Sequence, residues 1–267
     1  MLIGIFIGSY FLPKENQTYL DICKNWILPV CELSILIFVI FKIRKAIKNH
    51  KTLNSATPDF YDTLKRISRD ILPEKLALPF ATEIAVFYYG FIVWKTREIK
   101  NNEFTYHKTS GTIALLIGFI MIIGMETLAL HFLLARWSNV AAWILTALSV
   151  YTAIQVLGFA KSLSKRPVSI NTGSLTLKYG ILNEVDIPFA DIEKIELSRK
   201  SLEKDKLTRT LSPLGALESH NVVIHLKKEN ALIGLYGIKK KFNILGLHID
   251  KPKEFMEKME NALQQYI

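Results

Sequence analysis

The sequence predicts a bundle of about four transmembrane α-helices followed by a small β domain of about seven strands and a C-terminal helix. The first observation is that 50% of the 267 residues are hydrophobic, and those before residue 161 are concentrated in nearly uncharged blocks. The second is that four blocks approach the ~20 residues that a helix needs to cross a bilayer. The third is that short alternating segments broken by turn residues follow residue 165, which is typical of strands.

The predicted helical domain covers residues 1–164, with spans near residues 26–43, 76–94, 110–134 and 140–160. Trp26, Trp94 and Trp137 stand at block ends, where membrane proteins place interfacial aromatic residues. The last two blocks are joined only by "ARWSN", so we expect them to form an antiparallel hairpin. The apolar start, "MLIGIFIGSYFLP", is too short to span a bilayer, and we expect it to form an interfacial or partial helix.

The distribution of basic residues gives conflicting indications of orientation. Residues 42–75 contain 9 Lys and Arg, residues 95–108 contain 4, and Lys161, Lys165 and Arg166 follow the fourth block. Basic loops favour the cytoplasm. Four full crossings would place residues 42–75 opposite the other two basic regions. Either the second block dips in and returns, or the rule is broken once; we expect the C-terminal domain to be cytoplasmic.

An amphipathic segment precedes the second block. Phe60, Leu64, Ile67 and Ile71 recur at helical spacing, with basic residues between them. Such a helix is expected either on the membrane surface or packed on another part of the protein.

The predicted β domain covers residues 165–267. We expect strands at "VSI", "SLTLKYG", "ILNEVDIP", "FADIEKIELS", "NVVIHL", "ALIGLYG" and "ILGLHI", with a long basic loop after the fourth and turns at "KKEN" and "IKKKFN". Asp250 is expected as the N-cap of the final helix, and Pro252 stands early in it.

The segments "GSLTLKYGILNEVDIPFADIEKIE", "NVVIHL" and "GLYGIKKKFNILGLHIDKPKEF" resemble bacterial pleckstrin-homology-like domains attached to transmembrane helices. This resemblance implies a bent sheet closed at one end by a helix, and a role in binding or assembly. The segments "ATEIAVFYYGFIVW", "FTYHKTSG", "HFLLARWS" and "AAWILTALSVY" resemble a family of uncharacterised bacterial integral membrane proteins. That family lends no established activity.

Ionisable residues inside the predicted spans form the first candidate site, comprising Glu32, Glu83, Glu126 and His131. Each Glu falls within about 6 Å of the middle of its block. Convergence of the carboxylates would suit a proton or cation relay, or a metal site. Glu126 and His131 are five residues apart, however, which rotates them by about 140° around a helix, so we expect them to face different neighbours. Structural contacts between helices are the leading interpretation.

A basic surface of the β domain forms the second candidate site, comprising Arg199, Lys200, Lys204, Lys206 and Arg209 in the long loop and Lys239, Lys240 and Lys241 in a turn. These residues would meet anionic lipid headgroups, or simply form a solvated basic face. In "FTYHKTSG", we expect Tyr106 and His107 to be interfacial and Ser110 to be a helix N-cap.

The sequence therefore predicts a multi-pass protein of the bacterial inner membrane that acts as a non-enzymatic binding or assembly module rather than as an enzyme. The bilayer is one partner, and anionic lipid headgroups or a membrane protein are the others considered. The net charge of +10 has a sufficient cause in the membrane, so nucleic acid is not expected as a partner. No cofactor or metal motif is found. The alternative is a small transporter or membrane enzyme built on the intramembrane residues.

Overall fold

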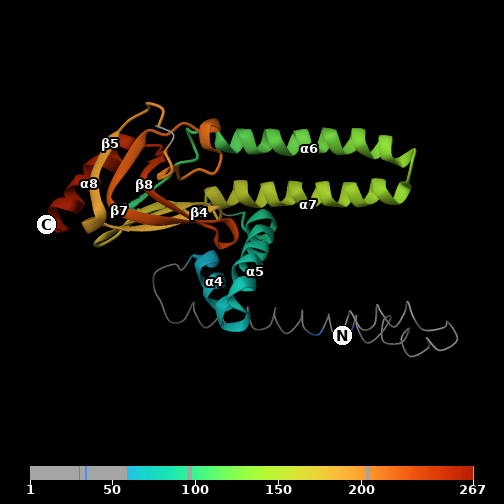
Figure 1. The fold of residues 1–267 in the computed structure, drawn as a ribbon, viewed down its shortest axis with the longest axis horizontal. Helices are drawn as coiled ribbons and strands as arrows, with labels where there is room; N and C mark the ends of the chain where they lie inside the picture. The colour runs from blue at the N-terminus through green and yellow to red at the C-terminus, as the bar shows by residue number, and fades with distance from the viewer. Residues whose placement is uncertain (1–29, 31–33, 35–58, 95–97, 203–204, 267) are drawn as a thin grey trace. The chain divides into compact units, whose positions relative to one another are not determined.

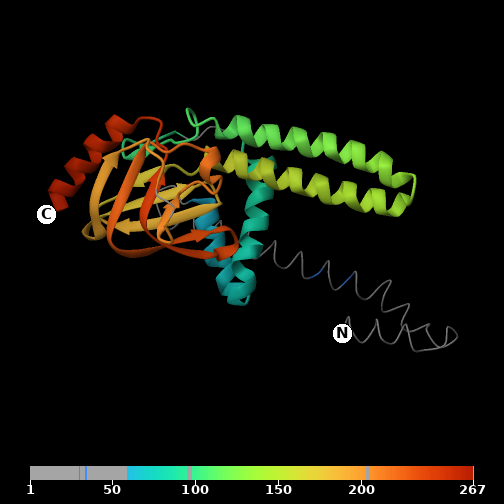
Figure 2. The same ribbon diagram turned by 45° about the horizontal axis from the view of Figure 1, so that its top comes forward.

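The computed structural model describes residues 59–94, 98–202 and 205–266, together with residues 30 and 34. Residues 68–267 form one compact unit, and residues 1–67 form another. The predicted span at residues 26–43 and its Glu32 lie outside the described residues. Figures 1 and 2 show the helices and strands of the described residues in two views.

The amphipathic segment forms helix α4, Phe60–Ile71, with Leu64 and Ile67 buried. Pro73 ends this helix, because a residue before proline is disfavoured in the α conformation. Pro73 then serves as the N-cap residue of the next helix, α5, Glu74–Phe87. A π-helical turn, η3, Tyr88–Ile92, extends α5.

Within the described residues, three helices are long and apolar enough to cross a membrane: Glu74–Ile92, Thr112–Ala135 and Asn139–Leu163. The second and third are helices α6 and α7, which confirm the two predicted blocks to within a few residues. They run side by side as the predicted hairpin, projecting from the sheet (Figure 1). Most of their large apolar side chains are exposed, as expected of surfaces that face lipid.

The ends of this hairpin are defined by specific residues. Ser138 is the N-cap residue of α7, and its side chain accepts a hydrogen bond from the Ala141 N–H at 3.4 Å. Gly111, with φ of 72°, is the N-cap residue of α6, so the expectation that Ser110 occupies that position is wrong. The Ser110 hydroxyl nevertheless accepts a hydrogen bond from the Thr112 N–H at 3.4 Å.

The described strands form one mixed eight-stranded sheet. In chain order they are β1 Glu103–Phe104, β2 Val168–Ile170, β3 Ser174–Tyr179, β4 Asn183–Pro188, β5 Ile192–Leu197, β6 Thr208–Thr210, β7 Val222–Gly234 and β8 Lys239–Leu247. The order in the sheet is β1-β2-β3-β4-β7-β8-β6, and β5 also pairs with β7. Only the β6–β8 pairing is parallel among these neighbours.

The structure corrects three predicted strand boundaries. "NVVIHL" and "ALIGLYG" belong mostly to the single strand β7, because the residues between His225 and Asn230 form a bulge rather than a turn. The three lysines 239–241 are the first residues of β8, where their side chains are exposed, and not a turn. The predicted long loop contains β6, a short strand with no apolar residue to indicate it.

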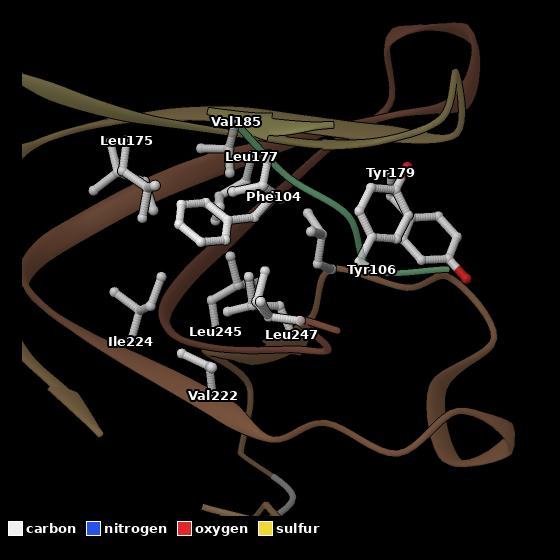
Figure 3. Packing of buried hydrophobic residues seen from close by; sticks show 14 of the residues in the cluster. Phe104, Tyr106, Leu175, Leu177, Tyr179, Val185, Val222, Ile224, Leu245 and Leu247 are labelled. Carbon is white, nitrogen blue, oxygen red and sulfur yellow. The ribbon is translucent and has the colours of Figure 1, made fainter. Parts of the chain in front are cut away.

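The segment between α5 and α6 belongs to the sheet. β1 pairs with β2, and Phe104 and Tyr106 lie in the same buried core as Leu175, Tyr179 and other sheet residues (Figure 3). The Tyr106 and Tyr179 rings stack with centroids 5.2 Å apart. Tyr106 is only 1% exposed, so the expectation that it is an interfacial anchor is wrong.

Helix α8, Pro252–Tyr266, closes the chain with Phe255 and Met259 fully buried. Pro252 is its first residue, as its fixed φ favours. Asp250 stands two residues before the helix and binds elsewhere, so its predicted N-cap role is wrong. Its carboxylate accepts hydrogen bonds from the N–H groups of Lys108 and Thr109, at 3.1 and 2.8 Å.

Helix α5 lies at a steep angle to the hairpin in both views (Figures 1 and 2). It crosses α7 where Gly90 approaches Gly158: a Cβ on Gly90 would lie 3.7 Å from the Gly158 Cα. A Cβ on Gly158 would lie 2.7 Å from the Val86 carbonyl oxygen, so no larger residue fits there without movement. Small residues at a crossing allow two helix backbones to approach closely.

Candidate functional site

The described residues of the predicted intramembrane site do not converge. Glu83, on α5, accepts hydrogen bonds from three side chains. Its Oε2 accepts from the Tyr151 hydroxyl at 2.7 Å and from Gln155 Nε2 at 2.6 Å, both on α7. Its Oε1 accepts from the Tyr236 hydroxyl at 2.9 Å. Tyr236 lies in the turn between β7 and β8 with a φ of 57°, so Glu83 joins α5 to the hairpin and to the sheet.

His131 contacts a different neighbour. Its Nδ1 lies 2.8 Å from the Thr146 hydroxyl on α7, and its ring packs edge-on against Trp143 with centroids 5.2 Å apart. These contacts join α6 to α7, in agreement with the leading interpretation of a polar contact between helices.

Glu126 is exposed on α6 and has no polar contact with any described residue. The described residues therefore do not bring Glu83, Glu126 and His131 together. Among them, no group of three or more His, Cys, Asp or Glu side chains is placed to hold a metal ion.

The basic residues of the sheet domain separate into distinct places. Arg199 and Arg209 line an open hollow of about 550 Å³ at β6. Lys200 and Lys206 are exposed nearby in sequence but do not line it, and Lys204 lies outside the described residues. Lys239, Lys240 and Lys241 follow the turn that contacts α5, and Lys241 forms an ion pair with Glu229 at 2.9 Å.

The wall of this arginine hollow carries further polar groups. The lining also includes four hydroxyl-bearing residues, a histidine and a glutamate, namely Ser201, Thr208, Thr210, Ser219, His220 and Glu218. Arg209 Nη1 donates to the Thr208 carbonyl oxygen at 2.8 Å, which holds that side chain along β6. Neither arginine forms an ion pair with a carboxylate among the described residues.

Glu218 is the unusual member of this set because it is buried, at 6% exposure. Its Oε2 accepts a hydrogen bond from the Tyr179 hydroxyl. Its Oε1 is buried without a hydrogen-bond partner in the described part of the chain. Burial, together with the nearby Glu218 charge, raises the pKa of Tyr179, so this hydroxyl remains a donor.

The arginine hollow is connected to the base of the hairpin. The Thr112 side chain, in the first residue of α6, interacts with the Tyr179 hydroxyl that binds Glu218. His248 makes a second connection: its Nδ1 lies 3.2 Å from the Ser219 carbonyl oxygen and its Nε2 lies 2.9 Å from the Thr109 hydroxyl. Leu116 of α6 lies in the sheet core. The hollow therefore lies within a few residues of the point where the chain enters α6.

Sequence reasoning identified Arg199 and Arg209 but missed Glu218 and His220. No periodicity or motif distinguishes those two residues, because they stand in an irregular segment between β6 and β7. A buried acid in a polar loop is visible only once the fold is known.

Comparisons with family models, with curated proteins and with solved structures found no match at the threshold applied.

Proposed function

We propose that this chain is a membrane-anchored binding module that engages the phosphate of phospholipid headgroups at the base of its hairpin. The observation that carries the proposal is the arginine hollow, whose wall is joined through Glu218 and Tyr179 to Thr112, the first residue of α6.

The placement of the hollow supports this function. The α6–α7 hairpin has the length and composition to cross a membrane, and it packs directly onto the sheet core without a flexible linker. Residues at the base of the hairpin would then lie at headgroup depth. Leu217, which is 64% exposed in the short helical turn after β6, is suited to contact the acyl boundary there.

The chemistry of the hollow supports it as well. A guanidinium presents a planar set of donors that matches phosphate oxygens, and it is more weakly hydrated than an ammonium group. Two arginines without carboxylate partners in the described chain are available for such an anion. The surrounding hydroxyl groups can donate to the remaining phosphate oxygens.

The setting that we propose is the bacterial inner membrane, with a pleckstrin-homology-like sheet domain on the cytoplasmic side. Seven strands, β2 to β8, followed by the closing helix α8, support the domain assignment. The crosswise position of α5 supports a topology in which α5 lies at the interface and does not cross. Residues 42–75, 95–108 and 161–166 would then share one face, which removes the conflict with the positive-inside rule.

A relay or an enzyme built on the intramembrane acids receives no such support. Glu83 and His131 have separate partners, and Glu126 has none among the described residues. Among the described residues, the hydrogen-bonded His131–Thr146 pair has no second titratable side chain in contact with it to exchange a proton with.

The test is lipid binding by the full chain in detergent, measured by native mass spectrometry with short-chain phospholipids. The sheet domain alone is unsuitable, because Phe104 and Tyr106 belong to its core. We expect Arg199→Ala combined with Arg209→Ala to weaken phospholipid binding at least tenfold.

The control is Lys206→Ala combined with Lys253→Ala, which removes the same charge from two exposed positions outside the hollow. We expect it to bind as the unchanged chain does. Equal losses in both double variants would mean that net charge, and not the hollow, attracts lipid, and the proposal would be wrong.

A further inference from the structure

The arginine hollow contains charges of both signs, and this points to a particular class of headgroup. The cationic side is formed by Arg199 and Arg209, and the anionic side by Glu218. A purely anionic ligand would satisfy only the arginines. It would leave the free Glu218 oxygen as it is, buried and without a partner in the described chain.

The unpaired Glu218 oxygen requires a donor. A buried carboxylate oxygen without a hydrogen bond costs free energy that a ligand donor would recover. Oε2 is already taken by Tyr179, so the donor would bind Oε1. Because Oε1 has almost no solvent-accessible surface, the carboxylate must turn toward the hollow for a donor to reach it. Since the carboxylate is an acceptor with formal negative charge, an ammonium group is the best matched donor.

The lining also distinguishes between kinds of ammonium group. Quaternary ammonium ligands are recognised by aromatic cages, because they have no N–H to donate. The described residues that line the hollow include no Phe, Tyr or Trp. A primary ammonium, with three N–H donors, fits an unpaired carboxylate oxygen surrounded by hydroxyl groups.

We propose that the arginine hollow binds a phosphoethanolamine headgroup, with its phosphate on Arg199 and Arg209 and its primary ammonium on Glu218. This inference rests on the proposed function, since it takes the bound phosphate as given and adds the ammonium. The volume of about 550 Å³ lies within the range of ordinary small-ligand sites.

The experiment compares short-chain phosphatidylethanolamine, phosphatidylcholine and phosphatidylglycerol on the full chain in detergent by native mass spectrometry. The first two share a phosphate and differ in the methyl groups on nitrogen. We expect phosphatidylethanolamine to bind at least tenfold more tightly than either of the other two. Equal binding of the ethanolamine and choline lipids, or preference for phosphatidylglycerol, would overturn the ammonium assignment while leaving headgroup binding intact.

A variant of Glu218 then tests whether this residue binds the ammonium group. Glu218→Gln keeps an acceptor for Tyr179 but removes the charge, so we expect it to bind the ethanolamine and choline lipids equally. Persistence of the tenfold preference would contradict the role of Glu218. If that variant does not fold, the comparison of the two lipids on the unchanged chain still decides the ammonium assignment.

Binding of none of the three lipids would overturn the proposed function itself, together with this inference. Soluble glycerophosphoethanolamine distinguishes the source of the headgroup. We expect it to compete only weakly, because it lacks the acyl chains that the bilayer holds beside the hollow. If glycerophosphoethanolamine competes at the same concentration as the lipid, the ligand of the hollow is a soluble phosphate ester, and the assignment to a membrane lipid is wrong.

Discussion

Helix α5 and the α6–α7 hairpin satisfy the same criterion of length and composition, yet they occupy different surroundings. Mean hydropathy falls from 2.4 for α6 to 1.8 for α7 and to 1.2 for the α5–η3 helix. The buried fraction rises in the same order, from 6% to 11% and 39%. The hairpin exposes its apolar surface, whereas α5 buries much of its surface against α7 and the β7–β8 turn.

The polar groups of the two regions follow the same division. Glu83 of α5 accepts hydrogen bonds from three side chains on two other elements, whereas Glu126 of α6 is exposed and has no polar contact among the described residues. The C-terminal end of η3 is also fixed: Lys161 of α7 donates to the Gly90 carbonyl oxygen at 2.8 Å and lies 3.6 Å from the centre of the Trp94 ring. An apolar stretch thus predicts that a helix is removed from water. Its contacts determine whether its surface faces lipid or packs against other parts of the protein.

Membrane topology should give the largest difference between these regions. In a chain with Cys23 and Cys31 replaced by Ser, we expect single cysteines at Lys75 and Asn101 to react with a membrane-impermeant thiol reagent from one face. A cysteine at Asn139, the first residue of α7 beside the hairpin turn, should react only from the other face. Reaction of Lys75→Cys and Asn101→Cys from opposite faces would mean that α5 crosses the bilayer.

The junction between the hairpin and the sheet should be the next most sensitive place. Arg166, directly after α7, is 1% exposed and pairs with Glu184 at 3.0 Å. Removal of one partner of a buried pair leaves an uncompensated charge, so we expect Arg166→Ala to lower the free energy of unfolding by about 3–5 kcal/mol. Denaturant unfolding in detergent measures this. Arg166→Met combined with Glu184→Gln should recover part of the loss, and a double variant no more stable than the single would contradict the ion-pair explanation.

The close crossing of α5 and α7 can be broken by a single side chain. We expect Gly158→Val to destabilise the chain by about 1–3 kcal/mol, because its Cβ would overlap Val86. Gly124→Val is the matched control, since a Cβ on Gly124 of α6 meets nothing within 4 Å. Equal thermal shifts for the two variants would show that the crossing contributes nothing.

The acidic residues should give the smallest difference. We expect Glu83→Ala to cost about 1–2 kcal/mol, because Tyr151, Gln155 and Tyr236 lose a shared acceptor. Glu126→Ala should change stability little or raise it, since it removes an ionisable group from an exposed apolar surface. Thermal unfolding of the two variants measures this difference in stability. A larger loss of stability for Glu126→Ala than for Glu83→Ala would indicate that Glu126 has a partner beyond the described residues.

The parts of the fold that followed from sequence are those that depend on local pattern. The hairpin was evident because α6 and α7 are uninterrupted apolar runs joined by a short polar connection. β2, β3, β4 and α8 were evident because their apolar residues recur with the period of their own element.

The parts that did not follow depend on tertiary partners. β7 continues through three charged residues, Lys227, Lys228 and Glu229, because they bulge outward and remain exposed. Among the described strands, β6 pairs with β8 alone, in parallel. Phe104 and Tyr106 resemble interfacial aromatic residues in sequence, and only their neighbours from residues 168–179 show that they are core. Arg199 and Arg209 could be predicted as basic, but not as two walls of one hollow with Glu218.

The position of β1 has a consequence for the order in which the chain folds. Residues 103–106 are synthesised before the hairpin, while their partners in β2 and β3 are synthesised after it. The sheet is therefore a discontinuous domain into which a helical hairpin is inserted. Insertion of α6 and α7 as an antiparallel pair brings residues 104 and 168 together. A free chain would have to close this long loop itself, at a cost in conformational entropy. We therefore expect maturation of the sheet to depend on membrane insertion, and a fragment starting at residue 165 would lack a native edge strand.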